Sequence, residues 1–107
     1  MSNLNRSGNA PILIQEAKAD VREAYQWYEK QAFGLGMDFL RCVEAVLTSI
    51  QRTPQLYPVV YETYRRALVR RFPFAVFFEH DVSENQCTVY SIFHCSQSPE
   101  KWEKRLR

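Results

Sequence analysis

Residues 74–80 read Phe-Ala-Val-Phe-Phe-Glu-His, and their apolar side chains fall on both parities of an extended strand. Successive side chains of a strand point to opposite faces, so a strand with one wet face alternates apolar and polar residues. This segment does not alternate, and we therefore expect it to be covered on both faces. A sheet with packed layers around this strand is the strongest constraint on the fold.

The segment before that strand has apolar residues at helical spacing. One set of apolar residues recurs at i, i+3, i+4 and i+7, and it predicts a helix from Ala17 onward with a buried face: Val21, Ala24, Tyr25, Tyr28 and Ala32. Asp20 with Glu23 three residues later is typical of a capping box at a helix start. Gly34 suits the left-handed position that ends such a helix.

A second helical pattern follows the glycines and ends before Pro54, because the residue preceding a proline avoids helical angles. Its apolar positions are Phe39, Val43, Val46 or Leu47, and Ile50. Two helices joined by so short a break are expected to pack as an antiparallel hairpin.

The remaining elements are short. Strands are predicted at Pro11–Gln15, Arg65–Arg71, Phe74–His80 and Cys87–Phe93, with a turn at Asp81–Gln86. Ser98 and Pro99 are typical of the start of a last helix, which Trp102 and Leu106 would dock onto the domain. The predicted class is α+β, in the order β-α-α-β-β-β-α. A two-helix hairpin packs on a small, mostly antiparallel sheet, and a short helix closes the chain.

Length and composition set the outer limits. The chain has 107 residues, which is one domain, and we assign residues 11–107 to it and residues 1–10 to a polar N-terminal tail. The tail lacks the apolar core of a signal peptide, and no segment reaches the length of a membrane span. Three cysteines without paired spacing favour a reducing cytoplasm. Net charge is only +2, so any anion site must be a local patch.

Four arginines stand just before the central strand: Arg65, Arg66, Arg70 and Arg71. Arginines that project from a small sheet indicate a polyanion or an acidic partner. On one continuous strand, Arg66 and Arg70 would share a face, and Arg65 and Arg71 the other. The alternative is structural: one pair would form salt bridges to helix carboxylates such as Glu23, Glu29 or Glu44, or would simply be solvated at a sheet edge.

Taken in order, seven segments resemble the RelE/ParE superfamily of type II toxin–antitoxin toxins, and most closely its ParE-like plasmid stabilisation branch. The segments cover nearly everything from Ile12 to Arg105, in matching order and spacing: 20–28 (DVREAYQWY), 34–39 (GLGMDF), 50–54 (IQRTP), 65–66 (RR), 70–78 (RRFPFAVFF), 89–94 (VYSIFH) and 99–102 (PEKW).

The resemblance implies a small toxin that a co-expressed protein antitoxin silences. ParE-like members poison DNA gyrase, which makes the gyrase–DNA complex the favoured target, reached by binding. RelE-like members instead cut messenger RNA on the ribosome, and this is the alternative. Family members usually read His-x-x-Arg before the closing Pro-x-x-Trp, whereas Gln97 stands at the arginine position here. A non-toxic homologue that only binds its antitoxin is therefore a third reading.

Catalysis is the weaker expectation. RNA cleavage needs groups that move protons and stabilise charge, and the resemblance implies that RelE-like nucleases use a C-terminal tyrosine and a cluster of sheet lysines and arginines. No tyrosine follows Tyr90 here, and no lysine lies between Lys30 and Lys101. His94 is the one candidate catalytic residue, although a lone histidine at a strand end is more often structural. No metal or cofactor is expected, because His94 and Cys95 would point to opposite faces.

Three further residues complete the candidate binding set. Trp27 lies off the apolar face of its helix, and an exposed tryptophan often marks a protein interface. We expect it to contact the antitoxin or a second copy in a homodimer. Lys101 and Arg105 on the last helix would extend the arginine patch, although basic residues there also complement the helix dipole.

Overall fold

The computed structural model describes residues 10–106. The predicted N-terminal tail, residues 1–10, lies outside this range except for Ala10. The carbonyl of Ala10 accepts a hydrogen bond of 3.0 Å from the side-chain amide of Gln86. Among the described residues, no helix combines the length and the apolar character needed to cross a membrane.

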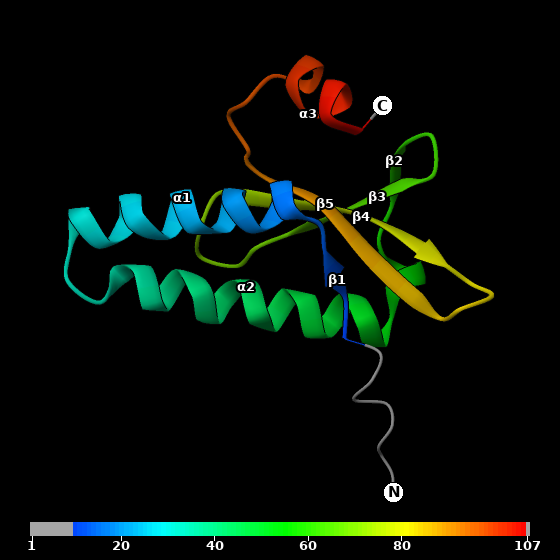
Figure 1. Cartoon of the computed structure of the whole chain (residues 1–107), viewed down its shortest axis with the longest axis horizontal. Coiled ribbons are helices and arrows are strands. Elements are labelled where there is room, and N and C mark those ends of the chain that lie inside the picture. Colours follow the sequence, from blue (N-terminus) through cyan, green and yellow to red (C-terminus); the bar gives the residue numbers. More distant parts are fainter. Residues whose placement is uncertain (1–9, 107) are drawn as a thin grey trace, which may run out of the picture.

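A five-stranded sheet in the order β1-β5-β4-β3-β2 forms the centre of the molecule (Figure 1). All neighbours are antiparallel except β1, which runs parallel to β5. The strands are β1 (Ile12–Leu13), β2 (Val59–Tyr61), β3 (Tyr64–Leu68), β4 (Phe74–Asp81) and β5 (Gln86–His94). The predicted mostly antiparallel sheet is confirmed.

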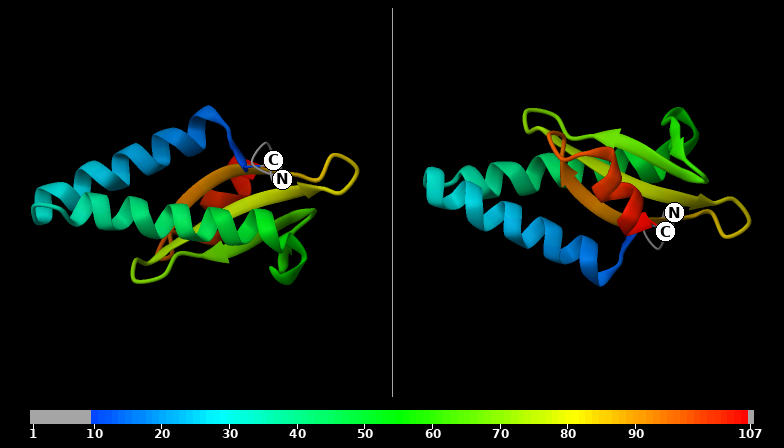
Figure 2. Two further views of the ribbon diagram at one scale, coloured as in Figure 1. Left: turned by 90° about the horizontal axis from the view of Figure 1, so that it is seen from below. Right: turned by 90° about the horizontal axis from the view of Figure 1, so that it is seen from above.

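Helices cover both faces of this sheet. The hairpin of α1 (Gln15–Gln31) and α2 (Leu35–Arg52) lies on one face, and the short α3 (Pro99–Leu106) lies on the other (Figures 1 and 2). A 3₁₀ turn, η2 (Pro54–Leu56), links α2 to the sheet. The predicted α+β class, with its helical hairpin and closing helix, is confirmed.

Strand β4 is buried on both faces, as its sequence predicts. Val76 and Phe78 join the core cluster under the hairpin, while Ala75 and Phe77 join the cluster under α3. The indole of Trp102 stacks on Phe77 with ring centroids 4.8 Å apart. Burial of these side chains supplies the main driving force that holds both helical layers to the sheet.

A β-bulge changes the parity of β5. Phe77 pairs with Ser91 and Phe78 pairs with Val89, so Tyr90 is an extra residue between them. Val89 and Ile92 can therefore both face the hairpin, although three residues separate them. The bulge also aims the carbonyl of Tyr90 toward the edge of the sheet, where Arg105 binds it.

The first helix differs from its prediction at both ends. It begins at Gln15, so the first strand is only two residues long and Asp20 lies in the second helical turn instead of a capping box. Ala32 is exposed and extended, because α1 ends at Gln31. Tyr28 is buried as expected, whereas Tyr25 is half-buried.

The turn between the helices is held by a side chain from α1. Gly34 has a φ of 87°, which confirms the predicted left-handed conformation, but it is the N-cap of α2 instead of the residue that ends α1. The carboxylate of Glu29 accepts hydrogen bonds from the N–H groups of Gly34 (3.0 Å) and Gly36 (2.9 Å). A carboxylate at a helix N-terminus satisfies free amide groups and complements the helix dipole.

The predicted strand Arg65–Arg71 is too long. Strand β3 ends at Leu68, and Arg70 and Arg71 lie in the loop that follows it. Arg71 has a φ of 73°, which reverses the chain and lets Val69 N–H bond the carbonyl of Phe74. The predicted sharing of faces therefore fails for these two arginines. Strand β2 was not predicted, because three residues after Pro58 are too short to show a period.

Candidate functional site

A groove of about 570 Å³ opens between α1, the end of β5 and α3. Trp27, His94, Lys101 and Arg105, all predicted site residues, lie along it. The full lining is Asp20, Glu23, Ala24, Trp27, Phe74, Ile92, Phe93, His94, Gln97, Lys101 and Arg105. We refer to this feature as the α1–α3 groove.

The groove continues into an apolar pocket of about 440 Å³ beside α1. Its walls are Ala24, Trp27, Tyr28, Pro73, Phe74 and His94. The Trp27 side chain is 58% exposed, which confirms that it lies off the buried face of α1. An apolar pocket next to a polar rim is the usual composition of a protein-binding surface.

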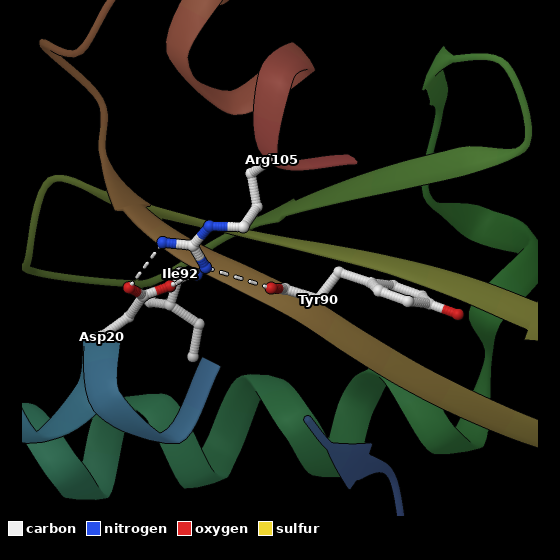
Figure 3. Close-up of polar contacts among 4 residues, drawn as sticks. All are labelled: Asp20, Tyr90, Ile92 and Arg105. Atoms are coloured by element: carbon white, nitrogen blue, oxygen red, sulfur yellow. Dashed lines mark hydrogen bonds and ion pairs between the residues drawn. The ribbon is translucent and has the colours of Figure 1, made fainter. Parts of the chain in front are cut away.

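An ion pair forms the polar floor of the groove (Figure 3). Both terminal nitrogens of Arg105 donate to the carboxylate of Asp20, each over 3.1 Å. The side chains are 26% and 12% exposed, respectively. The guanidinium also lies 4.7 Å from the centre of the Phe93 ring, in a cation–π contact. Arg105 is thus fixed and neutralised within the chain.

The same ion pair closes the edge of β5. Strand β1 pairs only with Thr88 and Val89, so the next part of the edge lacks a neighbouring strand. There the Asp20 carboxylate accepts the N–H of Ile92 (2.9 Å), and Arg105 donates to the carbonyl of Tyr90 (3.3 Å; Figure 3). Two side chains satisfy the backbone groups that a further strand would have bonded.

His94 is held by the turn that follows β5. Its Nδ1 accepts the backbone N–H of Ser96 (3.0 Å) and lies 2.7 Å from the Ser96 hydroxyl. Its ring packs edge-on against Phe74, with centroids 5.2 Å apart. Because Nδ1 accepts a hydrogen bond from the Ser96 amide, the neutral tautomer of the ring that fits this contact carries its proton on Nε2. His94 is therefore a hydrogen-bond donor toward its surroundings.

Gln97 lies half-buried beside His94, and its backbone N–H donates to the His94 carbonyl over 3.0 Å. Its side-chain oxygen is buried and has no hydrogen-bond partner within residues 10–106. Gln97 lines both the α1–α3 groove and a small neighbouring pocket that contains Arg66 and Cys95. The position where the resemblance implies an arginine thus lies between two surface hollows.

The four sheet arginines separate. Arg65 lies on the face of the sheet that the helical hairpin covers, and its guanidinium donates to the carbonyl of Tyr57 over 2.6 Å. Arg66 lies on the α3 side, while Arg70 and Arg71 are exposed in the β3–β4 loop. Within residues 10–106 none of them forms a salt bridge with Glu23, Glu29 or Glu44, so the salt-bridge form of the structural alternative is wrong.

Asp20 and Phe74 are among the groove residues that were not predicted as site residues. Asp20 was read only as a helix cap, and Phe74 only as a core residue. No local signal in the sequence identifies Asp20 as the partner of a residue 85 positions away. The adjacency of Pro73 and Phe74 to His94 follows from the pairing of β4 with β5, in which Phe74 lies opposite His94.

The described residues contain no group of three or more His, Cys, Asp or Glu side chains placed to hold a metal ion. Cys42, Cys87 and Cys95 are free. Burial raises the pKa of the Cys87 thiol. A protonated, buried thiol is a poor nucleophile, so the geometry around Cys87 gives no support to cysteine chemistry.

Comparison with solved structures gives a likeness in fold. No protein-family model matches the sequence, and no curated protein matches it. Among solved structures, a chain from the chromosomal ParDE TA system of P. aeruginosa superposes with a TM-score of 0.57 at 16% sequence identity. The match covers 80% of this chain and 95% of that one. This chain therefore shares its fold with a chain of a ParDE TA system.

Proposed function

We propose that this chain is the toxin component of a type II toxin–antitoxin system, kept inactive by a protein antitoxin. The observation that carries the proposal is the likeness in fold to a chain of a ParDE TA system, which extends over most of both chains. The family resemblance of the sequence segments points the same way. DNA gyrase in complex with DNA is the favoured target.

The α1–α3 groove is the proposed antitoxin site. Trp27 presents a large, partly exposed aromatic surface beside an apolar pocket, and such residues contribute much of the energy of protein interfaces. Lys101 and Glu23 stand on opposite walls and give the groove a charged rim. A homodimer contact through Trp27 is the alternative use of this surface.

Binding is favoured over catalysis by the hydrogen bonds of the candidate His94 and by the state of Tyr90, the last tyrosine of the chain. The Nδ1 lone pair of His94 is occupied by the Ser96 N–H, which leaves this histidine without a free base in the groove. Burial and the hydrogen bond to Glu79 raise the pKa of Tyr90 to about 12. Such a phenol is a poor general base or acid near neutral pH.

Purified gyrase tests the proposed target. The chain is added to gyrase with relaxed plasmid and ATP, and the same preparation is added to a cell-free translation reaction. We expect supercoiling to fall, or cleaved plasmid to accumulate, while translation continues. Arrest of translation with cut messenger RNA, and no effect on gyrase, would support the ribonuclease alternative instead.

The antitoxin site is tested separately. A genomic library from the source organism is screened for clones whose products bind the purified chain. We expect Trp27→Ser to weaken that binding at least tenfold, as for an interface hot spot. The control is Phe33→Ser, since Phe33 is 99% exposed at the tip of the helical hairpin, away from the groove. Equal losses in both variants would contradict the groove assignment.

A further inference from the structure

A second surface lies where the β3–β4 loop meets the loop between β5 and α3. The N–H of Cys95 donates to the carbonyl of Pro73 over 2.7 Å, and the two loops run side by side (Figure 2). Four basic residues border this junction from different elements: Arg66 from β3, Arg70 and Arg71 from the β3–β4 loop, and Lys101 from α3. Gln97 lines both the small pocket that contains Arg66 and the α1–α3 groove that contains Lys101, so it lies between these two basic residues. We call this surface the basic loop end.

The charges of the basic loop end are not neutralised within the described chain. Residues 10–106 contain two ion pairs, Arg41–Asp38 and Arg105–Asp20, and neither involves these four residues. Glu23 and Glu100 are acidic neighbours, but neither bonds them. For a chain of net charge +2, four unpaired cations at one end are a local concentration of positive charge.

The loop holds its arginines outward in a fixed conformation. Val69 N–H bonds the Phe74 carbonyl, and Phe74 N–H bonds the Phe72 carbonyl over 2.8 Å. Arg71 has a φ of 73°, in the left-handed region that a residue with a side chain adopts at some cost. Its guanidinium lies 5.5 Å from the centre of the Phe72 ring. A fixed backbone lowers the entropy lost when these side chains bind.

We propose that the basic loop end binds the phosphodiester backbone of duplex DNA. Guanidinium groups match phosphate oxygens with two parallel hydrogen bonds, and Lys101 adds a point charge. A single strand would also require exposed aromatic rings for base stacking. The rings nearest the three arginines are engaged inside the protein, since Phe72 is buried and Trp102 stacks on Phe77, whereas the exposed Trp27 lies in the groove that Lys101 lines. Contact with the backbone alone gives sequence-independent binding.

Fluorescence anisotropy with a labelled DNA duplex and a labelled single-stranded RNA of equal length tests the proposal. The variant R66Q/R70Q/R71Q removes three cations from the basic loop end. The control K18Q/R22Q/R52Q removes three exposed cations from α1 and α2. We expect the natural chain to prefer the duplex, and the loop-end variant to bind it at least about tenfold more weakly at low salt.

Salt dependence gives a second readout. The logarithm of the DNA-binding constant falls linearly with the logarithm of the salt concentration. Each lost phosphate contact should reduce the steepness of this fall by roughly 0.9, so the loop-end variant should show a much flatter dependence. R70Q/R71Q, which changes only exposed loop residues, should retain the thermal unfolding temperature and lose part of the slope. The proposal is overturned if the natural chain does not bind the duplex, if it prefers the RNA, or if both triple variants lose affinity equally.

Different results would contradict the proposed function and the proposed DNA-binding surface. Gyrase that is unaffected by a chain which still binds duplex DNA would contradict the proposed target and leave the DNA surface standing. Gyrase inhibition that persists in the loop-end variant, together with unchanged DNA affinity, would contradict the surface and leave the proposed target standing.

Discussion

Arg105 and Asp20 lie 85 residues apart in the sequence, yet they form two hydrogen bonds of 3.1 Å in the floor of the α1–α3 groove. Arg105 comes from the last turn of α3 and Asp20 from α1. Through Ile92 and Tyr90 the pair also holds β5. Three elements that border the groove, α1, β5 and α3, are thus connected at one point.

Loss of the Asp20 carboxylate should therefore destabilise the fold. Asp20→Asn leaves the half-buried Arg105 without a counter-charge, and we expect a cost of about 1–3 kcal/mol in the free energy of unfolding. Asp38→Asn is the matched control, because its partner Arg41 is 70% exposed and such pairs contribute about 0–1 kcal/mol. Urea unfolding measures both, and equal effects would contradict the role assigned to the Asp20–Arg105 pair.

The Glu29 carboxylate should stabilise the start of α2. Glu29→Ala leaves the N–H groups of Gly34 and Gly36 without this acceptor, and we expect a loss of about 1–2 kcal/mol. Glu44→Ala, on the exposed surface of α2, should change the free energy of unfolding far less. Thermal unfolding of the two variants side by side gives the comparison, and an effect in Glu44→Ala as large as in Glu29→Ala would refute the capping role.

Close packing at Gly36 makes a further prediction. A methyl group at this position would lie 2.7 Å from Cε1 of Tyr25 and 2.9 Å from Oε1 of Glu29. Gly36→Ala should therefore cost about 1–3 kcal/mol, despite the better helix propensity of alanine. In the double variant Gly36→Ala/Tyr25→Ala, removal of the ring should recover part of that loss. If Gly36→Ala raises the unfolding temperature, the contact is not as tight as described.

Alkaline pH should destabilise the fold through Tyr90. Burial and the hydrogen bond to Glu79 raise its pKa from 10.0 to about 12. The folded state therefore binds the phenolic proton more tightly than the unfolded state does. Its contribution is complete below pH 10 and is lost as the pH rises toward 12.

Tyr90→Phe should reduce the loss of stability over that range. Tyr25→Phe is a suitable control, because the Tyr25 hydroxyl forms no hydrogen bond within residues 10–106. Denaturant unfolding at several alkaline pH values compares the two variants with the natural chain. An unchanged pH dependence in Tyr90→Phe would show that other groups cause the effect. Tyr28 and Tyr64, whose pKa values are also raised, are the next candidates.

Local patterns predicted most of the fold. The spacing of Phe39, Val43 and Ile50 predicted α2, and the absence of alternation in β4 predicted that both its faces are covered. Both signals depend on neighbours in the sequence, so the chain itself carries them. Strand β2 has only three residues and follows Pro58, and so it gave no comparable signal.

The site was less predictable because its contacts are long-range. Trp27, His94, Lys101 and Arg105 were identified as candidates, but their meeting in one groove depends on how α1 and α3 pack on β5. Asp20 resembled a helix cap because its partner lies near the other end of the chain. The left-handed turn at Arg71 removed two arginines from β3, and no rule of strand parity anticipates such a turn.

The growth of cells that express this chain alone tests the central proposal most directly. Colony-forming units are counted after induction of the natural chain and of the variant Gln97→Arg in a bacterial host. We expect the natural chain to reduce the count by orders of magnitude, and the variant to be at least as toxic. If only Gln97→Arg kills, this chain is a non-toxic homologue. If neither reduces the count, the proposed toxin function is contradicted and only the shared fold remains.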